Sequence, residues 1–490
     1  CIDCLLPILV KIVNSSFSSS KFPDALKLAI VIPLIKKILL DCENKKNYRP
    51  VSNLSFLGKV IEKSAISRFS GHIDTHNLEE LFQSAYKELH SVETALLVIF
   101  DDLLKSVDNR NSVILTLLDY SAAFDTIEHG ILFKRLSNAY GLTGKALQWV
   151  SSYFTGRQQV VSINGMISNK QELTFGMPQG SIFGPFSYPK YAAPIARIAE
   201  KYEVKYHQYA DDTQLYIDFD SSNAHSQKSK IEECIEEIKQ WSTSNKLKLN
   251  DAKTELLVIQ SKFARSKDRN MLSLLIGEEN VSPSVSARNI GVIMDSHLTL
   301  EEHVSNICKT TYVHIRNISK IRRHITQDAA ASLINCLVTS RLDCMNSLLI
   351  GLPDTLISKL QKLQNHAAKI VVRKHKYDHV TPILQSLHWL PVSYRIEYKV
   401  LLLTFKCLHG KAPDYLAGRL TNYEPQRVLR SAEQHLLVEP KYNLKFYGAR
   451  AFSTAAPRLW NRLPLHLRRC QTLEAFKTSL KTELFKRAFL

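Results

Sequence analysis

The sequence lacks an apolar run long enough to cross a lipid bilayer. Its two most apolar N-terminal stretches, residues 4–13 and 25–35, fall short of the roughly 20 residues that a spanning helix needs, and lysines interrupt or close both. It also lacks a secretory leader pattern and any evident internal repeat. We therefore expect a folded protein without a membrane segment.

The sequence also lacks a regular cysteine framework. Its nine cysteines are scattered, mostly within apolar periodic stretches, and an odd, scattered set argues against systematic disulfide pairing. Cys1 and Cys4 form a single C-x-x-C without a second pair or a histidine at zinc spacing, so we expect no zinc site there. A reducing, intracellular compartment is expected.

Length and charge set wider bounds. The 490 residues, 45% of them apolar, are enough for two or three ordinary cores. The net charge of +18 is unevenly distributed, because residues 296–490 contain 30 basic and 13 acidic side chains, whereas residues 1–295 contain 34 and 33. The basic C-terminal part is therefore the expected contact surface for nucleic acid.

Two adjacent aspartates interrupt an otherwise apolar, alternating stretch at residues 206–217. Aromatic and aliphatic residues flank Asp211 and Asp212, so we expect two β-strands joined by a tight turn. Neighbouring carboxylates repel, and a hard cation such as Mg²⁺ between them would relieve the repulsion. The alternative is that both aspartates are only good turn residues.

A third carboxylate supports the metal-site interpretation. Residues 113–118 are β-branched and leucine-rich and predict a buried strand that ends at Asp119, which a sheet could hold against the hairpin. Farther along, the glycines and prolines of residues 176–185 predict a shaped loop whose backbone passes close to another group. Plain turn material would have the same composition.

Three motifs now stand in the order and spacing of motifs A, B and C of a reverse transcriptase. They are LDYSAAFD at 118–125, GMPQGS at 176–181 and YADD at 209–212, and residues 47–52, 91–96 and 249–254 also resemble this family. The whole resembles the polymerase of a non-LTR (LINE-type, Jockey-like) retrotransposon, strongly over residues 20–300 and more loosely beyond. Because such polymerases follow an endonuclease and the first residue here is not Met, we expect a fragment lacking the N-terminal endonuclease.

The resemblance implies an α+β fold, the right-hand polymerase with fingers and palm, followed by a mostly helical thumb and a C-terminal region. We expect fingers at 1–110, the catalytic palm with interleaved fingers at 111–295, a basic helical thumb-like domain at 296–420 and a C-terminal region of unknown role at 421–490.

Two local expectations can be checked directly. Asn164-Gly165 is a hairpin dipeptide and is predicted to join strands at 157–163 and 171–175. Pro189 falls where the family has a leucine-rich helix. Because an interior proline costs about 3 kcal/mol in a helix, we expect residues 186–194 to depart from that helix.

The resemblance also implies site residues. Asp119, Asp211 and Asp212 would be catalytic and would hold two Mg²⁺ ions, with Mn²⁺ as the alternative metal. Lys253 would be catalytic as a proton donor to pyrophosphate. The expected nucleotide-binding residues are Lys87, Tyr120, Phe124, Gln179 and Gly180. Lys87 stands where the family usually has Arg, so a point charge replaces a guanidinium group that can bind phosphate through two hydrogen bonds. Alternatively, Lys87 is an ordinary surface lysine.

Residues 300–420 predict helices with basic outer faces, and Arg373, Lys374 and Lys376 are the predicted nucleic-acid contacts.

The expected function is RNA-directed DNA polymerisation, with RNA template, DNA primer or target DNA and deoxynucleotides as partners, in nucleus and cytoplasm. One rival is a viral-type RNA polymerase, which Phe124 disfavours because an aromatic ring there suits exclusion of a ribose 2′-hydroxyl. The other rival is a non-enzymatic RNA-binding remnant.

Overall fold

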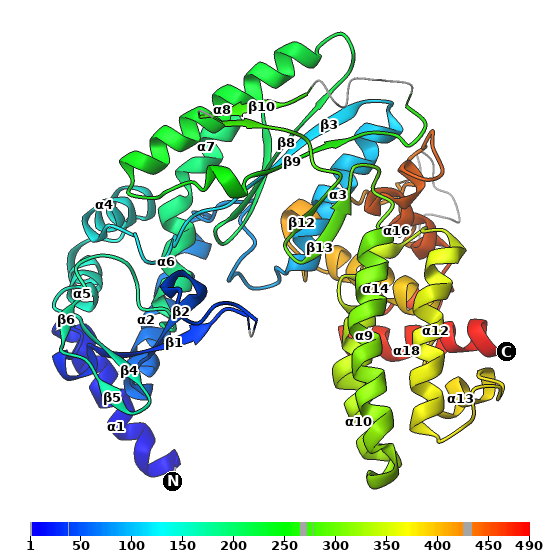
Figure 1. The fold of residues 1–490 in the computed structure, drawn as a ribbon, viewed down its shortest axis with the longest axis horizontal. Helices are drawn as coiled ribbons and strands as arrows, with labels where there is room; N and C mark the ends of the chain where they lie inside the picture. Colours follow the sequence, from blue (N-terminus) through cyan, green and yellow to red (C-terminus); the bar gives the residue numbers. More distant parts are fainter. Residues whose placement is uncertain (1, 38, 265–271, 278, 425–433) are drawn as a thin grey trace.

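The computed structural model describes residues 2–37, 39–264, 272–277, 279–424 and 434–490. The N-terminal helices and strands form one arm of the molecule, the helices after residue 300 form the other, and a strand-rich part joins them (Figure 1). The expected α+β class is confirmed. Among the described helices, none is long and apolar enough to cross a membrane.

The N-terminal arm contains a five-stranded mixed sheet. Its strands are β1 (Leu28–Ile35), β2 (Tyr48–Asn53), β4 (Gln158–Ile163), β5 (Met166–Ile167) and β6 (Gln171–Glu172). Strand β1 pairs antiparallel with β2 and parallel with β4, and β4 forms a hairpin with β5. The predicted turn at Asn164-Gly165 is confirmed, but the strand directly after it is 166–167 and not 171–175. The predicted strand at 171–175 is wrong beyond Glu172, because the chain then leaves the sheet and the Gly176 amide donates to the Ile127 carbonyl.

Eight helices lie among the described residues up to 244, and three of them, α3, α7 and α8, contact the second sheet described below. They are α1 (Ile2–Ser18), α2 (Phe56–Thr75), α3 (Val92–Asp108), α4 (His129–Tyr140), α5 (Gly144–Phe154), α6 (Phe183–Ala192), α7 (Pro194–Lys201) and α8 (Ala224–Ser244).

Helix α6 corrects the expectation about Pro189, because the helix continues through it. The side chains of Tyr188 and Tyr191 on either side are fully buried. Burying each ring contributes about 2–3 kcal/mol, which offsets the roughly 3 kcal/mol cost of the proline. The helix also begins inside the glycine- and proline-rich stretch, so the predicted loop ends at Ile182, and Pro185 lies in the first helical turn, where its missing N–H costs nothing.

The second sheet is antiparallel, with strand order β7-β8-β3-β9. Its strands are β3 (Ser112–Leu118), β7 (Lys205–Tyr209), β8 (Asp212–Phe219) and β9 (Glu255–Ile259). Alternate residues of a strand point to opposite faces, and here each face is covered. Ile114 packs with the residues of α4 to α8, whereas Leu115 packs with α3 and the helices after residue 300. This double burial explains why residues 113–118 are all β-branched or leucine, with Thr116 as the one polar residue.

The chain then forms two short hairpins and a helical part. The hairpin strands are β10 (Leu274–Ile276), β11 (Glu279–Val281), β12 (Ser286–Asn289) and β13 (Val292–Asp295). The helices are α9 (Glu301–Ile321), α10 (Gln327–Ile334), α11 (Ser340–Asp343), α12 (Asp354–Val371), α13 (Thr381–Ser386), α14 (Val392–Leu408), α15 (Asp414–Ala417), α16 (Phe452–Asn461), α17 (Leu465–Arg468) and α18 (Leu473–Phe489).

One hydrophobic core crosses from the second sheet into this helical part. It joins Val113 and Leu257 of the sheet to α3, and α3 to residues on α9, α12, α14 and α16. A smaller core, with Phe405 and Trp460 fully buried, packs α14 against α16 and α18. The domain boundaries at 110, 295 and 420 stay predictions, but the packing on either side of them is continuous.

Candidate active site

Three aspartates lie at adjoining strand ends of the second sheet. Asp119 directly follows β3, whose last residue Leu118 pairs with Thr213 of β8. Asp212 is the first residue of β8 and pairs with Tyr209, so that only Ala210 and Asp211 form the turn. The predicted hairpin is confirmed, and antiparallel register places Asp119 beside Asp212.

The Asp211 turn is held by a residue that sequence reasoning missed. The side-chain carbonyl of Gln83 accepts from the Ala210 amide at 3.1 Å, and the Gln83 amide group donates to the Ala210 carbonyl at 3.4 Å. Its backbone also bridges in parallel to Gln208 on β7, so residues 82–84 run along the edge of the sheet. A buried glutamine gives no local signal, because its partners are 127 residues away.

Burial and neighbouring negative charge disfavour the ionisation of Asp211 and Asp212. Burial raises the pKa of Asp211, and the charge of Asp119 raises it further. Burial, with the charges of Asp211 and Asp119, raises the pKa of Asp212 to about 6. Lys253 is a neighbouring cation. Its Nζ atom lies 3.4 Å from Asp119 Oδ2, and its side chain is 69% exposed. The site thus has an excess of negative charge.

A divalent cation suits this donor set. Asp119 Oδ2 is buried and accepts no hydrogen bond within the described part of the chain. Its ion pair with Lys253 Nζ at 3.4 Å leaves it able to bind a cation once the exposed lysine side chain moves aside. Carboxylate oxygens are the ligands that Mg²⁺ prefers, and a cation would relieve the repulsion described above. In the described residues, however, no group of three or more His, Cys, Asp or Glu side chains is close enough to form a complete metal cage.

Phe124 and Tyr120 follow Asp119 on the same loop but have different surroundings. The ring of Phe124 stacks on Tyr188 of α6 with centroids 4.8 Å apart and is partly buried. Tyr120 is only 4% exposed, and its hydroxyl lies 3.2 Å from Ser242 Oγ on α8. The Tyr120 side chain therefore belongs to the core, and the predicted nucleotide contact of Tyr120 stays a prediction.

The glycine-rich loop passes close to β2, as its composition predicted. Gly180 has a φ of +123°, and a Cβ atom there would lie 2.5 Å from the Ser52 carbonyl oxygen. The Ser52 amide in turn donates to the Gln179 carbonyl at 2.7 Å. The side-chain amide of Gln179 donates to both carboxylate oxygens of Asp125, at 2.9 and 3.1 Å, which fixes its direction. The loop thus links Asp125 to the first sheet.

Lys87 lines a cavity of about 1030 Å³ together with Tyr86, Lys190 and Asp414. Its ammonium group donates to the Glu80 carbonyl and lies 3.4 Å from the Glu79 carboxylate. Lys190 Nζ lies 2.6 Å from the same carboxylate. Burial lowers the pKa of Lys87 although Glu79 opposes this. Lys87 is therefore a paired, largely buried lysine in this structure.

The three predicted nucleic-acid contacts lie just after α12. Arg373 has a φ of +53° and donates to the carbonyls of Arg322 and Ile325 at 3.3 and 3.4 Å, so it helps to hold the end of α9. Lys374 and Lys376 are exposed. These two lysines are therefore the freer candidates for contacting a phosphate backbone.

Comparisons with known proteins agree with this geometry. A family described as reverse transcriptase (RNA-dependent DNA polymerase) matches residues 36–293. The chain is 27% identical over 313 residues to the RNA-directed DNA polymerase from mobile element jockey of Drosophila melanogaster, covering 62% of this chain and 33% of that protein. It is 23% identical over 363 residues to the probable RNA-directed DNA polymerase from transposon X-element of the same species, covering 71% and 38%.

The chain spans little more than a third of the length of these curated relatives. Among solved structures, the apo telomerase of Candida tropicalis is similar over 84% of this chain and 74% of that chain, with a TM-score of 0.44 and 9% sequence identity.

Proposed function

The chain belongs to the reverse transcriptase (RNA-dependent DNA polymerase) family, and from this membership we propose that it extends a DNA primer against an RNA template. Its similarity to the jockey and X-element polymerases supports a non-LTR retrotransposon as the source of this activity. The observation that carries the proposal is the convergence of Asp119, Asp211 and Asp212 at adjoining strand ends.

These three aspartates would hold the divalent cations of the reaction, with two Mg²⁺ ions as the proposed complement and Mn²⁺ as the alternative. When bound, the cations would acidify the primer 3′-hydroxyl and neutralise charge on the departing pyrophosphate. Lys253, paired with Asp119 but well exposed, would give a proton to that pyrophosphate. Its exposure allows the side chain to swing between the two.

The residues around the aspartates would select and orient the deoxynucleotide. Phe124, supported from behind by Tyr188, would lie against the sugar and exclude a 2′-hydroxyl. Gln179, oriented by Asp125, and Gly180 would contact the nascent base pair through the glycine-rich loop. Lys87 would reach the triphosphate once its pairing with Glu79 is exchanged for phosphate.

The remaining partners follow from charge. The basic residues after 296 would contact the phosphates of the template and the primer or target DNA, and Lys374 and Lys376 are exposed for that purpose. Location in the nucleus and cytoplasm, as the resemblance implies, stays part of the proposal.

Primer extension on an RNA template with Mg²⁺ tests the proposal. The protein should synthesise DNA, and Asp119→Asn or Asp211→Asn should each lower the rate by several orders of magnitude, because each removes charge from the metal ligands. Asp24→Asn is the matched control, since its carboxylate is 92% exposed, and it should keep the native rate. If either active-site variant extended primers at the native rate, the assignment of these carboxylates would be wrong.

A further inference from the structure

Tyr415 connects the helical part of the chain to the edge of the catalytic sheet. It belongs to α15 and is only 6% exposed. Its ring stacks on Phe82 at a centroid distance of 6.2 Å and meets the rings of His207 and His90 edge-on at 5.2 and 5.5 Å. Residues 82–90 thus pack against an aromatic side chain that lies well beyond the family match at 36–293.

The hydroxyl of Tyr415 contacts both ends of the segment that carries Lys87. It lies 2.8 Å from Ser84 Oγ and 3.0 Å from Thr94 Oγ1. Thr94 forms the capping box of α3 with Ser91, so this contact also holds the start of that helix. The Tyr415 hydroxyl therefore bridges Ser84 and Thr94. The chain between these two residues forms a loop that carries Lys87.

The same segment holds the catalytic turn on its other side. The Gln208 amide donates to the Phe82 carbonyl at 2.8 Å, and the Ser84 amide donates to the Gln208 carbonyl at 2.9 Å. Gln83, between them, binds the turn that contains Asp211. Movement of residues 82–84 would thus move both the Asp211 turn and Lys87.

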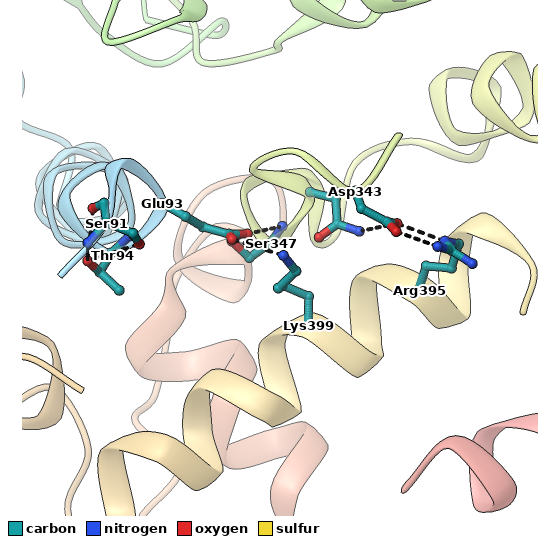
Figure 2. Close-up of polar contacts among 8 residues, drawn as sticks. Ser91, Glu93, Thr94, Asp343, Ser347, Arg395 and Lys399 are labelled. Carbon is teal, nitrogen blue, oxygen red and sulfur yellow. Dashed lines mark hydrogen bonds and ion pairs between the residues drawn. The ribbon is translucent and has the colours of Figure 1, made fainter. Parts of the chain in front are cut away.

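A second tie lies next to the first, at the N-terminal end of α3. Figure 2 shows Glu93 directed away from the capping box of Ser91 and Thr94 and toward Ser347 and Lys399 of the helical part. Its carboxylate accepts from Ser347 Oγ at 2.6 Å and from Lys399 Nζ at 3.1 Å. The side chain of Glu93 is 14% exposed, so this contact is largely shielded from water.

We propose that Tyr415 is a positioning residue for the deoxynucleotide site, acting through the segment 82–94. The inference rests on the proposed function, because it assigns the purpose of the segment to Lys87 and to the Asp211 turn. It also gives the helical part a role besides contacting phosphates, since α15 also brings Asp414 into the wall of the Lys87 cavity.

Hydrogen exchange tests the positioning without requiring polymerase activity. Tyr415→Phe keeps the ring and removes only the hydroxyl. Ser84 and Thr94 retain His207 and Ser91 as partners, so no buried group is orphaned and the fold should persist. We expect amide exchange at residues 82–86 and Gln208 to become about three- to tenfold faster, as for the loss of a neutral hydrogen bond.

Tyr394→Phe is the matched control, because it removes a hydroxyl that binds the Arg487 carbonyl at 2.9 Å within the same helical part. It should leave exchange at residues 82–86 unchanged. If the amides of residues 82–86 exchanged at the same rate in Tyr415→Phe and Tyr394→Phe, the proposal would be overturned, whatever the polymerase activity of the protein.

Kinetics then test the link to the nucleotide. In Tyr415→Phe the KM for deoxynucleotides should rise about three- to tenfold while kcat changes by less than about twofold, since uniform binding is lost rather than a transition-state contact. An unchanged KM would overturn the link. A native protein without polymerase activity would refute the proposed function, and the exchange result would still decide whether Tyr415 holds the segment.

Discussion

Arg419 offers a sharp test of how the C-terminal part is attached to the second sheet. Its guanidinium group, after α15, donates to both carboxylate oxygens of Asp102 on α3, at 2.5 and 3.1 Å, and lies 3.6 Å from Asp101. The Asp101 side chain is fully buried, Asp102 is 11% exposed and Arg419 is 23% exposed. Tyr216 of the sheet donates to Asp102 at 2.8 Å, so this cluster joins three parts of the chain.

Arg419→Met should destabilise the protein by about 3 kcal/mol. Removing one partner of a buried ion pair costs about 3–5 kcal/mol because the other charge stays buried, and the partial exposure of Arg419 favours the lower end. The double variant Arg419→Met/Asp102→Asn should be more stable than Arg419→Met alone, because its remaining groups carry no uncompensated charge. Asp101 would keep Lys105, 3.5 Å away, and the Ser453 amide as partners.

Urea unfolding, followed by tryptophan fluorescence, measures both effects. Lys477→Met is the control, since it breaks an exposed pair with Glu474 and should leave the urea midpoint close to that of the native protein. If Arg419→Met unfolded at the same urea concentration as this control, the carboxylates of α3 would not be desolvated. If the double variant were less stable than Arg419→Met, a stranded charge would not be the cause of the loss.

Two further predictions concern substrates. Phe124→Ala should raise the efficiency of ribonucleotide incorporation relative to deoxynucleotides, measured as the ratio of kcat/KM values, whereas Phe133→Ala, which removes a partly buried ring of α4, should not; an unchanged ratio would make Phe124 a packing residue only. Lys374→Ala/Lys376→Ala should weaken RNA binding similarly for unrelated sequences and reduce the slope of log affinity against log salt by at most about 1.4–1.8, as for two lost phosphate contacts. An unchanged slope would show that these lysines face only solvent.

Truncation is a poor test of where RNA binds. On charge alone, a chain ending near residue 295 would be the natural test of where RNA binds. The continuous core from Val113 to α16, and the carboxylates of α3, show that such a truncation would expose apolar surface and strand buried charges. Arg373 is likewise unsuitable for neutralisation, because it binds carbonyls at the end of α9.

The positions of Asp119, Asp211 and Asp212 at strand ends could be predicted from sequence because the signals of the strands are local. The continuous apolar run before Asp119 and the alternation around Asp211 each define a strand within a few residues. The helix through Pro189 could not be predicted in the same way. Its cost is visible locally, but the burial of Tyr188 and Tyr191 that offsets it comes from tertiary packing.

The contacts of Gln83 and Tyr415 were missed for a related reason. Tyr415 and Ser84 are 331 residues apart, and neither belongs to a charged or periodic pattern that would single it out. Arg373 has a structural contact that its local sequence does not reveal, and its predicted nucleic-acid contact stays a prediction. A basic cluster after a helix indicates nucleic-acid contact, yet the guanidinium group here also serves the backbone of another helix.

The carboxylates of α3 also constrain when the protein can fold during its synthesis. The partner of Asp102, Arg419, is synthesised 317 residues after it. The Asn443 amide, which donates to Asp108, is synthesised 335 residues after that aspartate. At about 5–20 residues per second, the first delay lasts roughly 15–65 seconds. Throughout that time the face of the second sheet that packs on α3 lacks the helices after residue 300, which complete its packing. The sheet can therefore complete its packing only after Arg419 and Asn443 have been synthesised, and a chaperone would have most to protect during this interval.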